Sequence, residues 1–279
     1  MSSLQIRVNQ LTPSIGAEIE GLDLSKSLND IELNRIYEIL IEHQVVFIRN
    51  QELTPEIHLN FAKSFGDPEP PHPIHPKVEG YENIVELKNG PNNPPDTDCW
   101  HTDLTFRQNP PFTSILWAKK IPPVGGDTLW LSLCRAYETL PKGLKAELNN
   151  LKAVHDMGGF RNNFSIDETD GRKLNEAHQN IGSAIHNVIK THPVSGRKLI
   201  FINESFTQHL IGMTPMESNR MLSYLFEHIE RPDHQVRFRW SEKTLALWDN
   251  RSTSHYACSD YLNYHRVMHR VTIVNDRRI

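Results

Sequence analysis

A histidine and an aspartate stand two positions apart within residues 100–103, Trp-His-Thr-Asp. In an extended segment, residues two apart point to the same face, so His101 and Asp103 are expected to project together. A third ligand must come from elsewhere in the fold, and His255 is the best candidate. Two imidazoles and one carboxylate on one face of an octahedral ion leave three positions open, which suits an iron that binds a keto acid and O₂.

The same pair of residues is a weak signal by itself. The chain contains 15 histidines, so a histidine and an aspartate at this spacing are expected by chance, and a lone histidine is more often packed or exposed than bound to a metal. His155, His192 and His269 have no matching partner pattern, and we expect them to be structural. The metal interpretation therefore depends on the surrounding sequence.

A strand-like run near the C-terminus carries two arginines on one face. Within residues 265–274, Arg266, Met268 and Arg270 alternate with Val267 and His269 and are expected to share a face. The two arginines would lie about 13 Å apart along the strand, a spacing that suits two different anions better than one. Arginine is the natural partner for carboxylate or sulfonate groups. Two surface arginines on an edge strand would give the same pattern.

Composition excludes several classes of protein. The chain has 279 residues, 38% of them hydrophobic and 23% charged, with a net charge of −4, so nothing favours nucleic acid or an anionic membrane as a partner. Apolar runs such as residues 45–48 are far shorter than the ~20 residues of a membrane span. No signal-peptide pattern is visible. Three cysteines, Cys99, Cys134 and Cys258, give no disulfide framework, so a reducing cytoplasm is expected.

Three helices are expected from their capping signals. Asn29 followed by Glu32 resembles a capping box, and the amphipathic run after it continues to about residue 43. Thr-Pro at residues 54–55 predicts a second helix, which Gly66 could end, and Thr-Pro at residues 214–215 predicts a third that reaches about residue 229. Strands are expected at residues 45–48, 84–87, 113–118, 128–131, 199–202, 236–240, 244–248 and 267–274.

The order of these elements favours one fold class. Strands do not alternate regularly with helices, so a doubly wound parallel sheet is not expected. A mainly β fold with flanking helices, a barrel or jelly roll, fits better. No repeat or linker divides the chain, so residues 1–279 are expected to form a single domain, with a loop at residues 90–95 close to the site.

Several motifs together resemble the taurine dioxygenase family. They lie, in order, at residues 15–19, 43–47, 100–106, 125–130, 248–251, 255–257 and 266–270. The resemblance covers nearly the whole chain and rests on several motifs at matching spacing. It implies a double-stranded β-helix, or jelly roll, with helices around it.

The resemblance also implies cofactors and roles for residues. His101, Asp103 and His255 would bind Fe(II) and form the catalytic centre, while Thr128 and Arg266 would hold the distal carboxylate of 2-oxoglutarate. The reaction would use O₂ to oxidise a C–H bond of a small anionic substrate, releasing succinate and CO₂. Because related halogenases lack the carboxylate ligand, Asp103 argues for hydroxylation or desaturation. The residues implied at the substrate are His72, His75, Thr97, the Leu104 backbone N–H, Phe206 and Arg270.

Two of these positions depart from taurine-specific members of the family. Thr97 stands where those members have an asparagine, and His75 where they have a tyrosine, so an ammonium group would be recognised less well. Residues 158–160 are also richer in glycine than the family usually is. The substrate could be taurine, another sulfonate, a sulfate ester or a carboxylate. A desaturase that acts on an amino-acid-derived carboxylate in a biosynthetic pathway is the main alternative.

Two other classes remain open from the residues. A metal-dependent hydrolase could use the same three ligands, but the sequence contains no HExxH motif and that reading assigns no role to Arg266 or Thr128. A non-catalytic jelly-roll binding protein would be expected to have lost a ligand, and all three are present. A homo-oligomer is possible, because family members are often dimers or tetramers.

Overall fold

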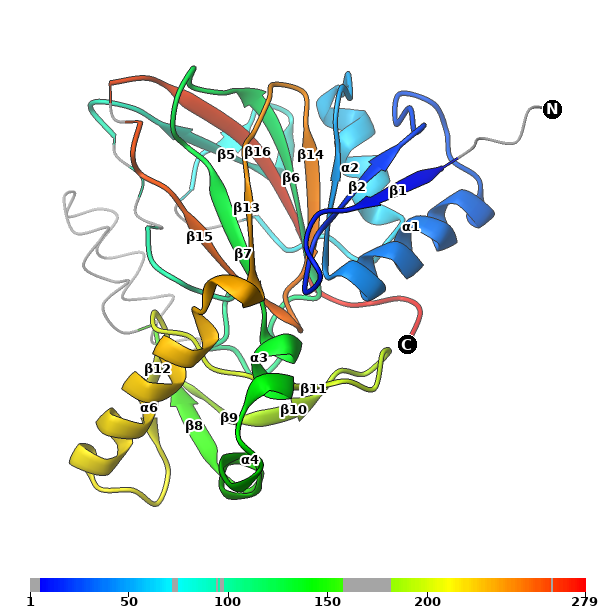
Figure 1. The fold of residues 1–279 in the computed structure, drawn as a ribbon. Helices are drawn as coiled ribbons and strands as arrows, with labels where there is room; N and C mark the ends of the chain where they lie inside the picture. The colour runs from blue at the N-terminus through cyan, green and yellow to red at the C-terminus, as the bar shows by residue number, and fades with distance from the viewer. Residues whose placement is uncertain (1–5, 72–74, 94, 96–97, 158–181, 262) are drawn as a thin grey trace.

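The computed structural model describes residues 6–71, 75–93, 95, 98–157, 182–261 and 263–279. Two packed sheets form the upper part of the molecule, with two helices against the larger sheet and a smaller layer below (Figure 1). The protein is mainly β with flanking helices, as the sequence predicts. His72, Thr97 and residues 158–160, which the sequence analysis singles out, lie outside the described residues.

The larger sheet has eight strands in the order β1-β2-β3-β14-β6-β16-β5-β4. All neighbours pair antiparallel except β2 and β3, which are parallel. Its strands are β1 (Arg7–Gln10), β2 (Ala17–Glu20), β3 (Val45–Ile48), β4 (Lys77–Val78), β5 (Tyr81–Asn89), β6 (Thr113–Lys120), β14 (Leu245–Asp249) and β16 (Arg266–Ile273). The smaller sheet, in the order β13-β7-β15, contains β7 (Thr128–Ser132), β13 (Gln235–Phe238) and β15 (Thr253–Ala257).

Aromatic side chains fill the space between the two sheets. Phe47 of β3 stacks on Phe238 of β13 with ring centroids 3.7 Å apart, and Trp130 of β7 meets Phe47 edge-on at 5.3 Å. Met268 of β16 is fully buried in the same cluster. Two mostly antiparallel sheets closed over such a core form the jelly roll that the sequence predicts.

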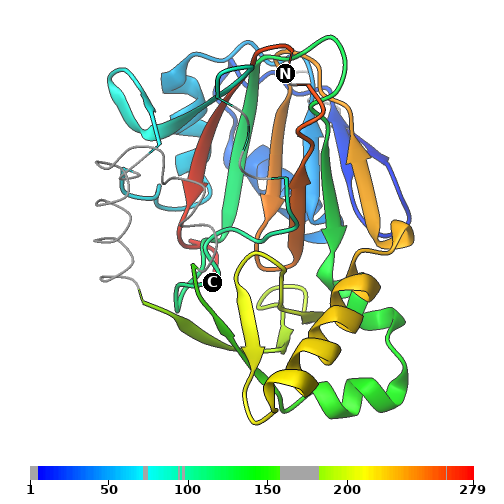
Figure 2. The same cartoon turned by 90° about the vertical axis from the view of Figure 1, so that its left-hand side faces the viewer.

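Two helices pack on the outer face of the larger sheet (Figures 1 and 2). Helix α1 (Asp30–His43) begins with the predicted capping box of Asn29 and Glu32, and α2 (Pro55–Lys63) begins at the Thr54 cap. The predicted role of Gly66 is wrong, because α2 ends at Lys63 and Ser64 is its C-cap. Gly66 is needed for a close approach instead, since a Cβ there would lie 2.0 Å from the Asn275 carbonyl oxygen.

A smaller layer lies below the jelly roll and has its own apolar core. It contains the sheets β12-β8-β9 and β10-β11 with several helices. Its members are α3 (Leu133–Thr139), α4 (Lys142–Leu148), β8 (Lys152–His155), β9 (Ala184–Asn187), β10 (Ile189–Thr191), β11 (Lys198–Ile200), β12 (Thr207–Leu210), α6 (Pro215–Ile229) and the short η2 (Pro232–His234). Within the described part of the chain, no helix combines the length and apolar character of a membrane span.

All eight predicted strands are present, with shifts at their ends. The clearest shift is at β13, which ends at Phe238 where the sequence predicts a strand as far as residue 240. The chain leaves the sheet there so that the Trp240 indole can donate a hydrogen bond to Thr128 Oγ1 at 3.0 Å. Most strands of the lower layer, and β1, β2, β4 and β15, were not predicted, because they are short and many of their residues are polar.

Candidate metal centre

Two segments far apart in the sequence meet at His101 and His255. Their backbones form an isolated antiparallel bridge, with N–H···O distances of 3.0 and 2.7 Å. The chain turns directly afterwards, at residues 103–106, so the extended segment expected from His101 to Asp103 does not continue. Leu104 adopts a left-handed conformation with a φ of 53°, which reverses the chain directly after Asp103.

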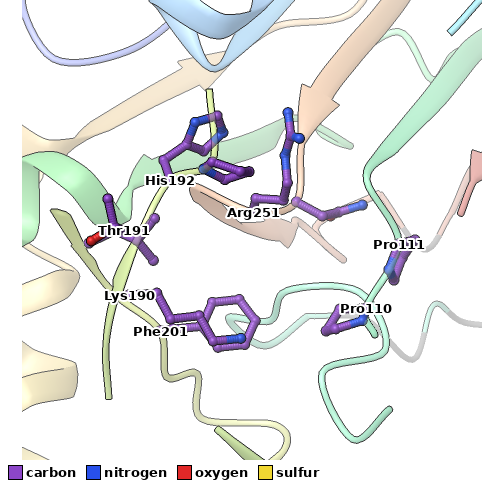
Figure 3. A pocket seen from close by; sticks show the side chains of 10 residues that line it. Pro110, Pro111, Lys190, Thr191, His192, Phe201 and Arg251 are labelled. Atoms are coloured by element: carbon purple, nitrogen blue, oxygen red, sulfur yellow. The ribbon is translucent and has the colours of Figure 1, made fainter. Parts of the chain in front are cut away.

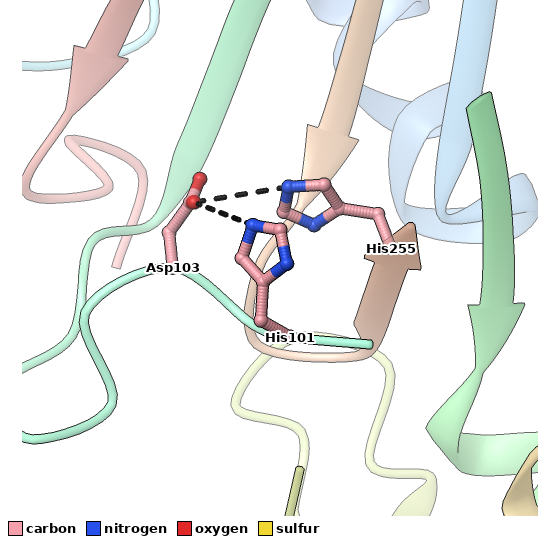
Figure 4. A group of neighbouring side chains, drawn as sticks. All are labelled: His101, Asp103 and His255. Atoms are coloured by element: carbon pink, nitrogen blue, oxygen red, sulfur yellow. Dashed lines mark ion pairs between the residues drawn. The ribbon is translucent and has the colours of Figure 1, made fainter. Parts of the chain in front are cut away.

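The turn brings Asp103 beside both imidazoles (Figure 4). Asp103 Oδ1 lies 4.0 Å from His101 Nε2 and 3.8 Å from His255 Nε2. One ligand atom from each residue falls within 4.8 Å of the other two, and all three side chains are buried. We call His101, Asp103 and His255 the ligand trio.

Hydrogen bonds orient two members of the ligand trio. The carbonyl oxygen of Cys99 lies 2.9 Å from His101 Nδ1, so Nδ1 carries the proton and Nε2 is left as the ligand atom. Ser114 Oγ donates to Asp103 Oδ2 at 2.7 Å, which leaves Oδ1 facing the histidines. Two imidazole nitrogens and one carboxylate oxygen that converge in a buried space fit a divalent iron.

Charges around Asp103 keep it ionised. Burial by itself would raise the pKa of this carboxyl, but His255, Arg270 and His101 outweigh that effect and lower the pKa to about 2. Burial lowers the pKa of His255 to about 3. For Asp103 and His255, the deprotonated carboxylate and the neutral imidazole are the protonation states that a metal ion needs from its ligands.

Arg266 lies buried in the core without an acidic partner. No carboxylate of the described residues lies within ion-pair distance of its guanidinium, and its Nε has no hydrogen-bond partner there. Its Nη2 is 3.4 Å from Thr128 Oγ1, and the rings of Trp240 and Tyr261 lie about 6 Å away. A buried cation in such surroundings is costly unless an anion joins it. Arg266 and Thr128 together fit one carboxylate of 2-oxoglutarate.

Arg270 lies four residues further along β16 and faces the ligand trio. Its Nη1 is 3.8 Å from Asp103 Oδ1, and its buried Nε has no hydrogen-bond partner among the described residues. His75 lies close by: burial, followed by the charge of Arg270, lowers its pKa to about 4. The structure therefore gives the two arginines different surroundings, as their spacing in the sequence predicts.

The chain is similar to proteins of one family along almost all of its length. The family model described as "Taurine catabolism dioxygenase TauD, TfdA family" matches residues 7–272. The chain belongs to this family. An alkylsulfatase from Acinetobacter baylyi is 36% identical over 98% of this chain and 86% of that protein. An alpha-ketoglutarate-dependent sulfate ester dioxygenase from Pseudomonas putida is 33% identical over 98% of this chain and 91% of that protein.

Solved structures agree with this assignment. A taurine dioxygenase from Burkholderia xenovorans superposes with a TM-score of 0.84 at 35% identity, covering 97% of this chain and 90% of that one. A structure of AAD-2 in complex with Mn(II) and N-oxalylglycine has a TM-score of 0.82 at 26% identity, covering 98% of each chain. This TauD/TfdA enzyme is an Fe(II)- and 2-oxoglutarate-dependent dioxygenase, as the resemblance in its sequence implies. This assignment replaces the two other classes that the sequence left open, a metal-dependent hydrolase and a non-catalytic binding protein.

The remaining predicted residues of this TauD/TfdA enzyme fall into two groups. Phe206 is buried and meets Phe106 edge-on, with ring centroids 5.0 Å apart, and Leu104 lies in the turn beside Asp103. His72 and Thr97 lie outside the described residues. The metal-binding role of the ligand trio and the binding roles of the other predicted residues stay predictions.

Sequence reasoning missed the side chains that support the site. Ser114 holds Asp103, and Trp240 holds Thr128. Only Trp240 carried a sequence signal, as an aromatic residue at the end of a predicted strand. A serine inside an apolar strand gives no comparable signal.

A cavity of about 200 Å³ lies between strands β10 and β11 of the lower layer and the segments at residues 110–111 and 250–251 (Figure 3). Its lining contains no predicted site residue and comprises Pro110, Pro111, Lys190, Thr191, His192, Pro193, Leu199, Phe201, Asn250 and Arg251. Lys190 Nζ lies 3.5 Å from the centroid of the Phe201 ring and donates to His186 Nδ1 at 3.1 Å. The chemistry is therefore placed at the ligand trio, where the donor atoms converge, and not in this cavity.

Proposed function

We propose that this enzyme hydroxylates the carbon that carries the anionic head of a small alkyl sulfate ester. The observation that carries the proposal is the position of Arg270, whose guanidinium lies 3.8 Å from Asp103 Oδ1 in a buried space. Once a metal ion takes up the charge of Asp103, the guanidinium is left to hold a substrate anion. The carbon that carries an anionic head held there would lie next to the metal.

The proposal gives each predicted residue a role. The ligand trio holds Fe(II), and Arg266 with Thr128 holds the distal carboxylate of 2-oxoglutarate. The other residues form the substrate pocket: Arg270, with His72, His75, Thr97 and the Leu104 N–H, binds the anionic head, and Phe206 lines the wall. Residues 1–279 would act as one catalytic domain in a reducing cytoplasm, with no nucleic acid or membrane partner, as a monomer or a homo-oligomer.

The bound groups supply the oxidation, and the protein supplies position. Iron and 2-oxoglutarate together activate O₂, with one oxygen atom ending in succinate and the other in the substrate, while CO₂ leaves. Arg270 fixes the head group, so the adjacent C–H bond is the one presented to the metal. The hydroxylated carbon then expels sulfate, and its O–H proton passes to solvent, which leaves an aldehyde.

Overall identity does not separate a sulfate ester from taurine, because the alkylsulfatase and the sulfate ester dioxygenase are 36% and 33% identical to this chain and the taurine dioxygenase is 35% identical. One observation favours the sulfate ester: burial lowers the pKa of His75 to about 4. A neutral imidazole carries no negative charge for an ammonium group, so the taurine amine would gain little there.

The test is a panel of substrates with the purified enzyme, Fe(II), ascorbate, 2-oxoglutarate and O₂. A linear alkyl sulfate should accelerate succinate formation and yield equal amounts of aldehyde and sulfate. Taurine and a carboxylate such as phenoxyacetate should accelerate it less. Release of sulfate with an alcohol and without O₂ would contradict the proposal and indicate hydrolysis. An unsaturated product would indicate the desaturase instead.

A further inference from the structure

A chain of hydrogen bonds ends on the carboxylate of the ligand trio. The Trp248 indole N–H donates to Asn250 Oδ1 at 2.9 Å, and Asn250 Nδ2 donates to Ser114 Oγ at 3.2 Å. Ser114 Oγ then donates to Asp103 Oδ2 at 2.7 Å. We call Trp248, Asn250 and Ser114 the relay. All three of its side chains are at most 2% exposed.

The direction of every proton in the relay follows from its first member. An indole N–H can only donate, so the oxygen of the Asn250 amide must face Trp248 and its NH₂ group must face Ser114. That NH₂ group can also only donate, so Ser114 Oγ accepts there. The single proton of the Ser114 hydroxyl is therefore directed to Asp103 Oδ2.

The relay is not needed to hold its two strands together. Ser114 of β6 and Trp248 of β14 are already partners in a five-residue antiparallel register. Asn250 continues beyond β14, where its backbone N–H donates to the Phe112 carbonyl oxygen at 2.9 Å. Backbone hydrogen bonds thus fix the position of these residues, and the side-chain bonds are left to act on Asp103.

We propose that Ser114, oriented by Asn250 and Trp248, is a positioning residue that restricts Asp103 to one metal bond, through Oδ1. A carboxylate with both oxygens free can bind a metal through both of them and fill two positions. With Oδ2 held by Ser114, Asp103 fills one position and leaves three open for 2-oxoglutarate and O₂. This inference rests on the proposed ligand trio but not on the identity of the substrate.

The first test measures metal binding by the metal-free protein, with Mn(II) as a probe that resists oxidation. Ser114→Ala should raise the dissociation constant about tenfold, the size expected when a supporting hydrogen bond to a ligand is lost. The matched control is Thr113→Val, because Thr113 Oγ1 donates to the Trp248 carbonyl oxygen at 2.7 Å and is equally buried. This control should lower stability and leave Mn(II) affinity within twofold. Ser114→Thr, which keeps the hydroxyl, should restore binding.

The second test counts the water molecules on bound Mn(II), from the line broadening of its paramagnetic resonance in ¹⁷O-enriched water. Ser114→Ala should bind one water fewer than the unmodified protein, because Asp103 can then use both oxygens. An unchanged water count, with Mn(II) affinity within twofold and only the melting temperature lowered, would overturn the proposal.

A third variant separates failure of this inference from failure of the ligand assignment. His255→Ala should abolish Mn(II) binding if the trio is correct. If His255→Ala binds Mn(II) normally, the ligand assignment itself is wrong. If Ser114→Ala does not fold, Asn250→Ala can be used for the same two measurements. Asn250 lines the cavity described above, so its truncation enlarges an existing cavity and does not create a new one in the core. Normal affinity and water count in that variant would overturn the role of the relay.

Discussion

Two buried clusters of histidine and aspartate lie close together in this molecule, and they differ in how their polar atoms are used. In the Asp249 cluster, formed by His192, Asp249, Arg251 and Asp276, the polar groups bind one another. Asp249 accepts from Arg251 at 2.6 and 2.9 Å and lies 3.0 Å from His192 Nε2. His192 Nδ1 accepts two backbone N–H groups, and Arg251 also donates to Asp276.

The ligand trio contains similar residue types, but its metal-binding atoms do not form hydrogen bonds with one another. Hydrogen bonds hold the far sides of His101 and Asp103, while His101 Nε2, His255 Nε2 and Asp103 Oδ1 converge without a hydrogen bond between them. The comparison teaches that buried histidine and aspartate do not by themselves make a site. A metal site arises where ligand atoms face a common point without a hydrogen bond between them, while hydrogen bonds hold the far sides of their side chains.

The largest expected effect comes from removing a member of the ligand trio. His255→Ala should lower succinate formation at least about a thousandfold, because the metal loses one of three protein ligands. The melting temperature of the metal-free protein should change little, since His255 Nδ1 has no hydrogen-bond partner among the described residues. Activity assays and thermal unfolding without metal check both halves. A large loss of stability without loss of activity would reverse the assignment of the two clusters.

The opposite result is expected in the Asp249 cluster. Asp249→Ala leaves the half-buried Arg251 and the buried His192 without their shared partner, so the free energy of unfolding should fall by about 3–5 kcal/mol. Urea unfolding measures this loss. The Mn(II) affinity of the folded protein should stay within twofold of normal. If metal affinity falls and stability does not, the cluster belongs to the metal site.

A smaller effect is expected at the buried arginine that lacks an acidic partner. Arg266→Lys should raise the KM for 2-oxoglutarate about tenfold or more, because an ammonium group cannot make the two parallel bonds of a guanidinium. Mn(II) affinity should not change. Arg237→Lys is the control, since Arg237 is exposed and already pairs with Asp127 at 2.7 Å. Equal KM values in both variants would exclude Arg266 as the 2-oxoglutarate residue.

The smallest effect concerns a buried histidine outside both clusters. Burial lowers the pKa of His58 from its ordinary value of 6.5 to about 3. The unfolded chain binds a proton at His58 below pH 6.5 and the folded chain does not, so stability is full above pH 6.5 and falls as the pH drops toward 3. The expected loss is about 1.4 kcal/mol per pH unit.

Urea unfolding at several pH values between 7 and 4.5 tests this difference. His58→Gln should flatten the pH dependence by about one proton, whatever its effect on stability at pH 7. The control is His209→Gln, which makes the same substitution at an exposed histidine. A slope that does not respond to His58→Gln would show that His58 is protonated in the folded state.

Local patterns in the sequence were sufficient for much of the fold and part of the site. The capping box at Asn29 and the Thr-Pro pair at residues 214–215 predicted the starts of α1 and α6, because both signals come from residues that are close in the sequence. The spacing of Arg266 and Arg270 placed both on one face of β16, because side chains alternate along a strand. The third ligand, His255, was predicted from its position between two predicted strands, and the family motifs implied the same residue.

Only the tertiary structure decided how these residues work together. The bridge between His101 and His255 joins positions about 150 residues apart, and the left-handed conformation of Leu104 turns the chain directly after Asp103. Ser114 and Asn250 are common residue types whose importance lies in partners distant in the sequence. By itself the sequence determined which side chains could bind a metal and two anions. The packing of the strands determined which polar atoms were satisfied and which stayed open, because hydrogen-bond partners are set by proximity in space.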